Sequence, residues 1–119
     1  MTFVDIVKKI VGGEKLIDCV AVSAFDGLII EEWKSDTFTL DLSAIAAEIA
    51  LLLKELSRIS EENALSKVDE LCFGGSDYYI HVLAVEQDYY LFVVTSEVLL
   101  TGKTRFYLQS AVPALRDTL

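Results

Sequence analysis

The chain is poor in the residues from which catalytic and metal sites are usually built. Its 119 residues include one histidine, His81, and two cysteines, Cys19 and Cys72, whose spacing is unlike that of metal ligands. His81 stands between apolar neighbours, and no sequence signature places a nucleophile and an orienting acid beside it. We therefore expect a buried or near-surface histidine rather than a catalytic base. We expect no catalytic residue, no metal and no cofactor.

Basic residues are also scarce. Ten lysines and arginines stand against 19 aspartates and glutamates, which gives a formal net charge of −9. Such a chain cannot neutralise a run of phosphates, so nucleic acids and anionic membrane surfaces are disfavoured as partners, and a basic or mixed patch is favoured. The clustered acids are expected to be solvated faces rather than paired catalytic carboxylates: Glu31, Glu32, Glu61, Glu62, Asp69 and Glu70.

Long uninterrupted apolar runs are missing as well, although 53% of the residues are hydrophobic. The most apolar helical segment carries Glu48, Lys54 and Glu55 in its middle, which argues against membrane insertion. No basic leader with an apolar stretch opens the sequence, and the cysteines fit buried thiols in a reducing compartment better than a disulfide. We expect one cytoplasmic domain over residues 1–119, with part of its apolar surface buried in an oligomer.

Two segments at the start of the chain have clear local signals. Residues 3–11 place their apolar side chains on one helical face and are followed by a pair of glycines. Residues 16–24 and 28–33 are β-rich and are separated by Asp26-Gly27, a pair that adopts the positive φ of a tight turn. These segments predict a short helix followed by a β-hairpin.

A long helix is expected to begin at Asp41 or Ser43 and to end at about Asn63. Its apolar residues form one wide stripe suited to covering a sheet: Leu42, Ile45, Ile49, Leu52, Leu53, Leu56 and Ile59. Leu51 lies on roughly the opposite side of the helix, with the following neighbours: Ala47, Lys54 and Arg58. A leucine there is either singly exposed, which is common, or a contact for a partner.

Residues 68–73, 78–85 and 89–95 predict three strands, and the short turns between them make neighbouring strands antiparallel. The last two are apolar on both faces, so both faces of the sheet need a cover, whereas 68–73 carries charge as an edge strand does. The tyrosine pairs Tyr78-Tyr79 and Tyr89-Tyr90 fit cross-strand packing better than a ligand surface.

The predicted fold class is α/β (α+β), a three-layer α/β/α sandwich. Its five-stranded antiparallel sheet carries the long helix on one face and the N- and C-terminal helices on the other.

The last segment predicts a helix from Thr101 that points these residues toward the core: Phe106, Leu108, Val112 and Leu115. Pro113 lacks the backbone N–H that the middle of a helix needs, so we expect a kink there or an end near Ala111. The stretch Thr101-Gly102-Lys103-Thr104 is similar to the end of a phosphate-binding P-loop. That motif needs another glycine five residues before its second one, where the chain has Glu97, so nucleotide binding is disfavoured.

Three segments in this element order resemble the Roadblock (dynein light chain) superfamily, over essentially the whole chain. They are the strand, Asp-Gly turn and strand of residues 22–30, the alanine-rich helix start of residues 42–49, and residues 102–108, where a glycine precedes an arginine and an aromatic residue. The resemblance extends to prokaryotic MglB-like partners of small GTPases.

The resemblance implies a non-enzymatic partner of small Ras-like GTPases or of motor complexes, acting as a scaffold or stimulating GTP hydrolysis without an arginine finger. It implies a homodimer, or a dimer with a second Roadblock protein, formed by the long helices and an edge strand. The implied dimer-interface residues are Ala47, Leu51, Val68, Glu70, Leu71, Cys72 and Phe73. The implied GTPase-facing residues are Leu51, Lys54 and Arg58.

Two other function classes stay open. Small-molecule sensors of PAS- or profilin-like architecture also place helices on an antiparallel sheet, and a sensor needs a cavity. An enzyme with an unrecognised site would show a titratable group of strongly shifted pKa in a cleft. A monomer with an internal pocket would favour the sensor, and a dimer with a bare outer face would favour the interaction module.

Overall fold

The computed structural model describes residues 2–12, 17–86, 88–96 and 101–119. Its elements are, in chain order, α1 (Phe3–Gly12), β1 (Ile17–Ala24), β2 (Ile29–Lys34), α2 (Leu42–Glu62), β3 (Glu70–Gly74), β4 (Tyr79–Glu86), β5 (Tyr89–Thr95) and α3 (Thr101–Thr118). The order is the one that the sequence predicts. The largest shift of a strand is in β3, which begins at Glu70 rather than at Val68.

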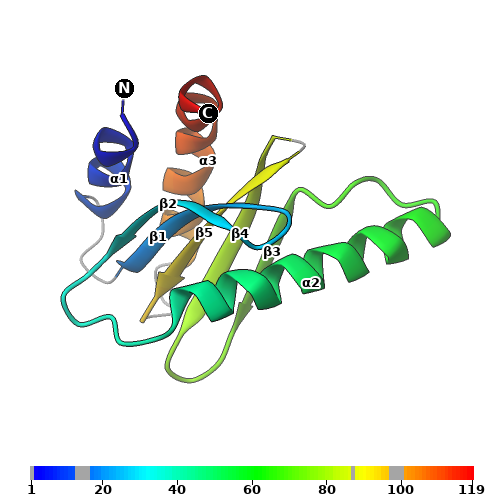
Figure 1. Ribbon diagram of the computed structural model, residues 1–119, viewed down its shortest axis with the longest axis horizontal. Coiled ribbons are helices and arrows are strands. Elements are labelled where there is room, and N and C mark those ends of the chain that lie inside the picture. Colours follow the sequence, from blue (N-terminus) through cyan, green and yellow to red (C-terminus); the bar gives the residue numbers. More distant parts are fainter. Residues whose placement is uncertain (1, 13–16, 87, 97–100) are drawn as a thin grey trace.

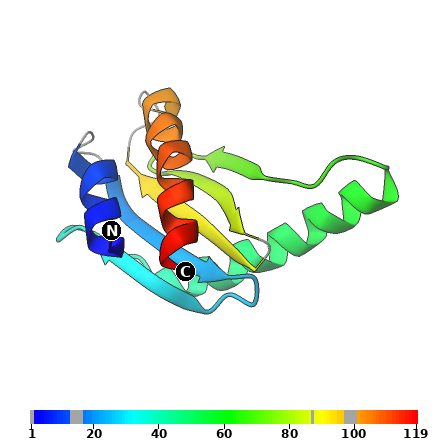
Figure 2. The same ribbon diagram turned by 90° about the horizontal axis from the view of Figure 1, so that it is seen from above.

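The strands form one five-stranded sheet in the order β2-β1-β5-β4-β3, in which every neighbouring pair is antiparallel. α2 lies across one face, and α1 and α3 lie side by side on the other (Figure 1; Figure 2). The predicted three-layer α/β/α sandwich is confirmed. β3 forms one edge of the sheet, as its charge predicted, and β2 forms the other.

Alternate side chains of the central strands enter two separate cores. On the side of α1 and α3, the β1 and β5 residues of the core are Ile17, Val20, Val22, Leu91 and Val93. On the side of α2, they are Cys19, Ala21, Tyr90, Phe92 and Val94. Because β1 and β5 are apolar on both faces, they are stable only in the middle of the sheet, where helices cover both sides.

The helix starts are fixed by side chains that the sequence marks clearly. The Thr2 N–H donates to Asp5 Oδ2 at 3.1 Å, and the Asp5 N–H donates back to Thr2 Oγ1 at 3.3 Å. This reciprocal capping box begins α1. Asp41 caps α2 by accepting a hydrogen bond from the Ala44 N–H at 3.1 Å.

The expected end of the last helix near Ala111 is wrong. α3 continues through Pro113 to Thr118. Val112 and Leu115, on either side of the proline, are both buried, whereas Pro113 itself is exposed. The packing of both turns on the core outweighs the one backbone hydrogen bond that proline removes.

The apolar stripes of two helices are broader than the faces that they bury. Phe106 of α3, expected to point to the core, is 65% exposed, and Ile59 of α2 is 38% exposed. Smaller residues of α2 are buried as well and let the helix approach the sheet closely: Ala46, Ala50 and Ser60. Some large apolar side chains are thereby left on the surface.

Candidate interaction surfaces

β3 directs one side of its backbone to the outside of the sheet. The Ala84 N–H donates to the Asp69 carbonyl at 2.9 Å, which continues the β3–β4 ladder by one hydrogen-bonded pair. Bonded and non-bonded pairs alternate along such a ladder. Three residues of β3 therefore direct their N–H and C=O groups away from β4: Glu70, Cys72 and Gly74. An edge of this kind is a template for the addition of a strand.

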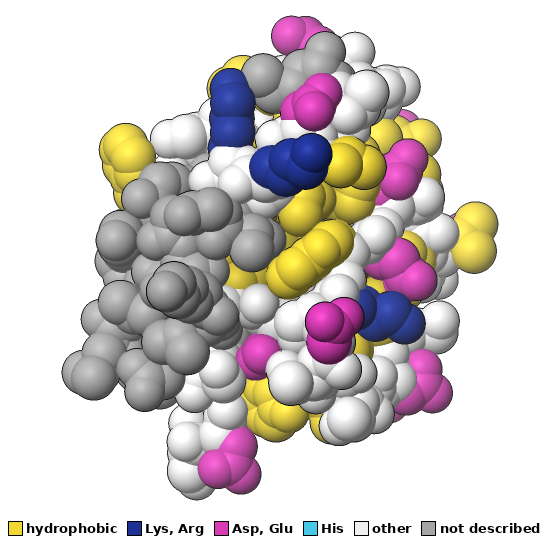
Figure 3. Space-filling view, turned by 90° about the vertical axis from the view of Figure 1, so that its left-hand side faces the viewer, with side chains coloured by type: hydrophobic (Ala, Val, Ile, Leu, Met, Phe, Trp, Pro, Cys, Tyr) yellow, Lys and Arg dark blue, Asp and Glu magenta, His cyan; other side chains and the backbone are white. Residues whose placement is uncertain are grey.

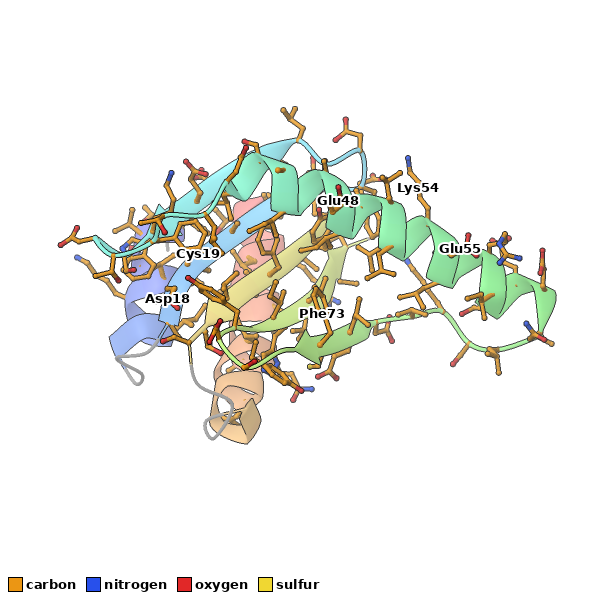
Figure 4. The ribbon with its side chains drawn as sticks, turned by 90° about the horizontal axis from the view of Figure 1, so that it is seen from below. Asp18, Cys19, Glu48, Lys54, Glu55 and Phe73 are labelled. Atoms are coloured by element: carbon orange, nitrogen blue, oxygen red, sulfur yellow. The ribbon has the colours of Figure 1, made fainter. Side chains whose placement is uncertain are left out.

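An apolar groove runs between α2 and β3. It has a volume of about 470 Å³ and is lined by Ala44, Ile45, Glu48, Ile49, Leu52, Phe73 and Ile80. Leu52 is 40% exposed, and so is Phe73, which projects from β3 toward α2 (Figure 4). The β3 edge and this groove adjoin, and together they are called the edge surface below. It is the strongest candidate contact surface among the described residues.

The solvent side of α2 carries a smaller surface, the outer ridge, made of Leu51, Lys54 and Arg58. Leu51 is 62% exposed, and Lys54 points away from the sheet (Figure 4). The Arg58 guanidinium is bound by two carboxylates of its own helix. Its Nε donates to Glu55 at 3.1 Å, and its Nη1 donates to Glu62 at 2.7 Å. Its hydrogen bonds lower the pKa of the Glu55 carboxyl. Within the described residues, Lys54 makes no ion pair, so it is the basic group of this ridge that can meet an acidic partner.

Ala47 lies on the same flank of α2 as Leu51; it is exposed, and its backbone lies close to the β1–β2 turn. Gly27 in the β1–β2 turn has a φ of +90°, and a Cβ built on it would lie 3.0 Å from the Ala47 Cα. At about 100° per residue, Ala47 and Leu51 lie roughly 130° around the helix from Ile45 and Leu52 of the groove. Ala44 and Glu48 of the groove lie within about 60° of Leu51 around the helix, so the outer ridge adjoins the edge surface and is centred on another flank of α2.

The structure brings together only part of the implied dimer interface. Residues 70–73 share one edge strand, with Val68 just before it, whereas Ala47 and Leu51 lie on another flank of α2. Sequence reasoning missed the groove residues of α2 and β4, which are Ile45, Leu52 and Ile80. The available signal was the width of the α2 stripe, because one sheet cannot bury so broad a band of a helix.

The single histidine and the two cysteines lie on two different faces of the sheet. His81 is fully buried in β4, and its Nδ1 lies 3.2 Å from the Sγ of Cys72. Cys19 is buried on the α2 side, and burial raises the pKa of its thiol to about 12. β5 and β4 lie between β1 and β3, so the topology excludes a disulfide between Cys19 and Cys72 within one chain.

Three further expectations concern metals, phosphates and membranes. Among the described residues, no group of three or more metal-ligating side chains could hold a metal ion. The P-loop-like stretch opens α3, and Glu97 lies outside the described residues. No helix in the described part of the chain is long and apolar enough to cross a membrane.

A second groove lies on the other face of the sheet, between α1 and α3. It has a volume of about 290 Å³ and is lined by Ile6, Lys9, Ile10, Phe106, Ser110, Ala111 and Ala114. Figure 3 looks onto the side of the molecule where α1 lies and shows basic side chains next to apolar ones at its upper end. The sheet separates this groove from the edge surface, so the two cannot share one contact.

Solved structures decide the fold family. The structure of gliding protein MglB from Thermus thermophilus matches 97% of this chain and 86% of that chain, with a TM-score of 0.85 and 14% identity. A Roadblock/LC7 domain from Streptomyces avermitilis matches over 98% and 97% of the two chains, with a TM-score of 0.81 and 12% identity. This is the Roadblock fold.

The fold that the Roadblock resemblance implies is thus confirmed. MglC from Myxococcus xanthus matches over 100% of both chains, with a TM-score of 0.68 and 25% identity. No family model matches the chain, and a search of curated proteins finds no similar sequence. Because the identities are low, these likenesses establish the fold, and the function has to be argued from the surfaces.

Proposed function

We propose that this chain is a homodimeric, non-catalytic interaction module that binds a small Ras-like GTPase in the cytoplasm. It acts as a scaffold or stimulates GTP hydrolysis by the GTPase, and a second Roadblock protein in place of one copy is the heterodimeric form of the same proposal. The observation that carries the proposal is the edge surface, where a sheet edge and an apolar groove adjoin on a Roadblock fold.

Two copies can join their β3 edges around a two-fold axis. The strand has five residues, and the antiparallel register that pairs all of them places Leu71 beside Phe73 of the partner subunit, on the α2 side. Phe73 and Leu52 would then leave water, and full burial of such a side chain contributes about 1.5 to 3 kcal/mol. Because the two-fold axis repeats each contact, the burial of each groove side chain contributes twice to the free energy of dimerisation.

The outer ridge is available to a GTPase in such a dimer. Its basic residues, Lys54 and Arg58, lie on another flank of α2 than Ile45 and Leu52 of the groove, so strand pairing leaves them uncovered. Leu51 supplies an apolar contact, and Lys54 supplies a positive charge for an acidic side chain. Arg58 is engaged by Glu55 and Glu62 of its own helix, which is why the proposal includes no arginine finger.

Light scattering after size-exclusion chromatography, combined with single-turnover GTP hydrolysis, tests the proposal. We expect a dimer of the chain alone and a stable complex with a small Ras-like GTPase of its source. Faster hydrolysis would identify an activator, and binding at an unchanged rate would identify a scaffold. A monomer that binds none of these GTPases would contradict the proposal and favour the small-molecule sensor.

A further inference from the structure

We propose that Cys72 is a redox-modification site, where two copies joined through β3 bring their thiols together and a small disulfide oxidant converts them into an interchain disulfide. This inference rests on the proposed homodimer. It is carried by three observations: the direction of the β3 backbone, the contact of Cys72 with His81, and the face of the sheet on which both lie.

The register of the paired edges follows from the β3–β4 ladder. Glu70, Cys72 and Gly74 direct their backbone groups outward, so these residues form the hydrogen-bonded pairs with a partner strand. Cys72 is the middle residue of the strand. The two-fold register that pairs the whole strand therefore sets Cys72 opposite Cys72 of the partner subunit. A register shifted by two residues keeps the same hydrogen-bonding pattern, but it leaves residues at the ends of the two β3 strands unpaired.

The spacing of such a pair suits a disulfide. Hydrogen-bonded antiparallel pairs have Cα atoms about 5.5 Å apart, inside the range of about 4.4 to 6.8 Å found for disulfides. The Cβ atoms have to approach by about an ångström from the usual cross-strand distance. A small closing movement of the two edges is needed, together with a rotation of each Cys72 side chain from His81 of β4 toward the partner strand, and the resulting bond is easily reduced.

Cys72 also has a base within reach. Its Sγ lies 3.2 Å from Nδ1 of His81, which is directly across the β3–β4 ladder. The thiolate is the form that attacks a disulfide, and an imidazole that takes up the thiol proton supplies it. Among the described residues of these strands, Glu70 lies on the same face of β3, and the ring centroid of Tyr79 is 5.1 Å from that of His81.

The face of the sheet decides which cysteine reacts. Cys72 is half-buried and points to the face opposite α2, so pairing of two α2 helices does not cover it. Cys19 is completely buried under α2, and its thiol stays protonated at neutral pH because burial raises its pKa to about 12. Cys19 is therefore a built-in control within the same chain.

The reaction balances with oxidised glutathione as the disulfide. The Cys72 thiolate attacks one sulfur of oxidised glutathione, and the glutathione thiolate that leaves takes up the proton from His81. The Cys72 thiolate of the partner subunit then attacks the mixed disulfide at the protein sulfur and releases a second glutathione. Two protein thiols are oxidised to one disulfide, and one oxidised glutathione is reduced to two glutathione thiols.

The first test treats the full chain with oxidised glutathione and separates it on a denaturing gel without reductant. Light scattering under reducing conditions gives its oligomeric state independently. We expect a dimer in reductant and a covalent dimer after oxidation that reductant reverses. The covalent dimer should be absent in Cys72→Ser and retained in Cys19→Ser. A dimer in reductant that does not cross-link, or a cross-link that persists in Cys72→Ser, would overturn the inference and leave the proposed function standing. A monomer in reductant would overturn the proposed dimer itself.

The second test measures the role of His81 without requiring a dimer. In Cys19→Ser, the rate of Cys72 alkylation by iodoacetamide is followed against pH for the folded chain and for the same chain in urea. We expect the folded chain to react at least tenfold faster than the unfolded chain near pH 6.5, and His81→Asn to lose that advantage. Identical profiles for the folded and the unfolded chain would show that the imidazole does not activate Cys72.

Discussion

The hydroxyl of Tyr90 donates a hydrogen bond to the carbonyl oxygen of Ala46 over 2.8 Å. Tyr90 is fully buried in the central strand β5, and Ala46 lies in the buried face of α2. The bond thus fixes the position of α2 along the sheet. Since the edge surface is formed by α2 and β3 together, this position also sets the width of the groove.

We expect Tyr90→Phe to lower the free energy of unfolding by about 1 kcal/mol, the usual net contribution of a neutral hydrogen bond. The aromatic packing stays, and the Ala46 carbonyl keeps its place in the helix ladder. Urea denaturation measures the change. Tyr89→Phe, at a half-buried neighbour, is the matched control and should differ little from the parent. Equal stability of the two variants would show that the bond does not hold α2.

Gly27→Ala should cost about 1 to 3 kcal/mol of folding stability, because a residue with a Cβ is strained at positive φ. The Gly27 φ is +90°, and the added Cβ would press on the Ala47 backbone at 3.0 Å. Gly75→Ala is the control, since its Cβ would meet nothing within 4 Å. Thermal unfolding by circular dichroism compares the two, and a tolerated Gly27→Ala would contradict the close approach of turn and helix.

Leu52→Glu and Phe73→Glu should each shift the proposed dimer to monomer, because each introduces two charges into one two-fold interface. Light scattering at several protein concentrations measures the shift, and far-ultraviolet circular dichroism checks that the monomer is folded. Leu28→Glu alters an even more exposed leucine, 67% exposed, near the opposite sheet edge. It should remain dimeric. If all three variants behave alike, the dimer does not use the edge surface.

Leu51→Ser and Lys54→Glu should weaken GTPase binding at least tenfold and leave the dimer intact, because both residues lie on another flank of α2 than Ile45 and Leu52 of the groove. The dissociation constant from calorimetry, with light scattering on the same samples, separates the two effects. Glu61→Lys adds charge further along α2, at an exposed position, and serves as the charge-changing control. Unchanged affinity in both ridge variants would place the GTPase contact elsewhere.

Asp18→Asn should raise stability at neutral pH. Burial raises the pKa of the Asp18 carboxyl, and one of its oxygens is buried without a hydrogen-bond partner among the described residues. A raised folded-state pKa means that the charged form destabilises the folded state, fully at neutral pH and progressively less as the pH falls through that pKa. The gain of Asp18→Asn over the parent should therefore disappear below about pH 4. Urea titrations at several pH values measure it, with the exposed Asp36→Asn as control.

Much of the fold could be predicted because its signals are local. The caps at Thr2 and Asp41, and the positive-φ turn at Gly27, each depend on a few adjacent residues. The apolar character of β4 and β5 on both faces predicted that both faces of the sheet are covered, and the charge of β3 placed it at the edge. The Roadblock element order follows from these signals alone.

The tertiary structure alone decided how those elements meet. The sequence could not say which flank of α2 lies on the sheet, because its apolar stripe is wider than the face that small residues such as Ala46 and Ala50 bring into contact. It could not show that α3 passes through Pro113, because the packing that holds the helix comes from distant strands. Nor could it place Cys72 against His81, since that contact depends on the register of two strands. The sequence determined the elements through neighbours along the chain, and long-range packing decided which side chains were left over to form the surfaces.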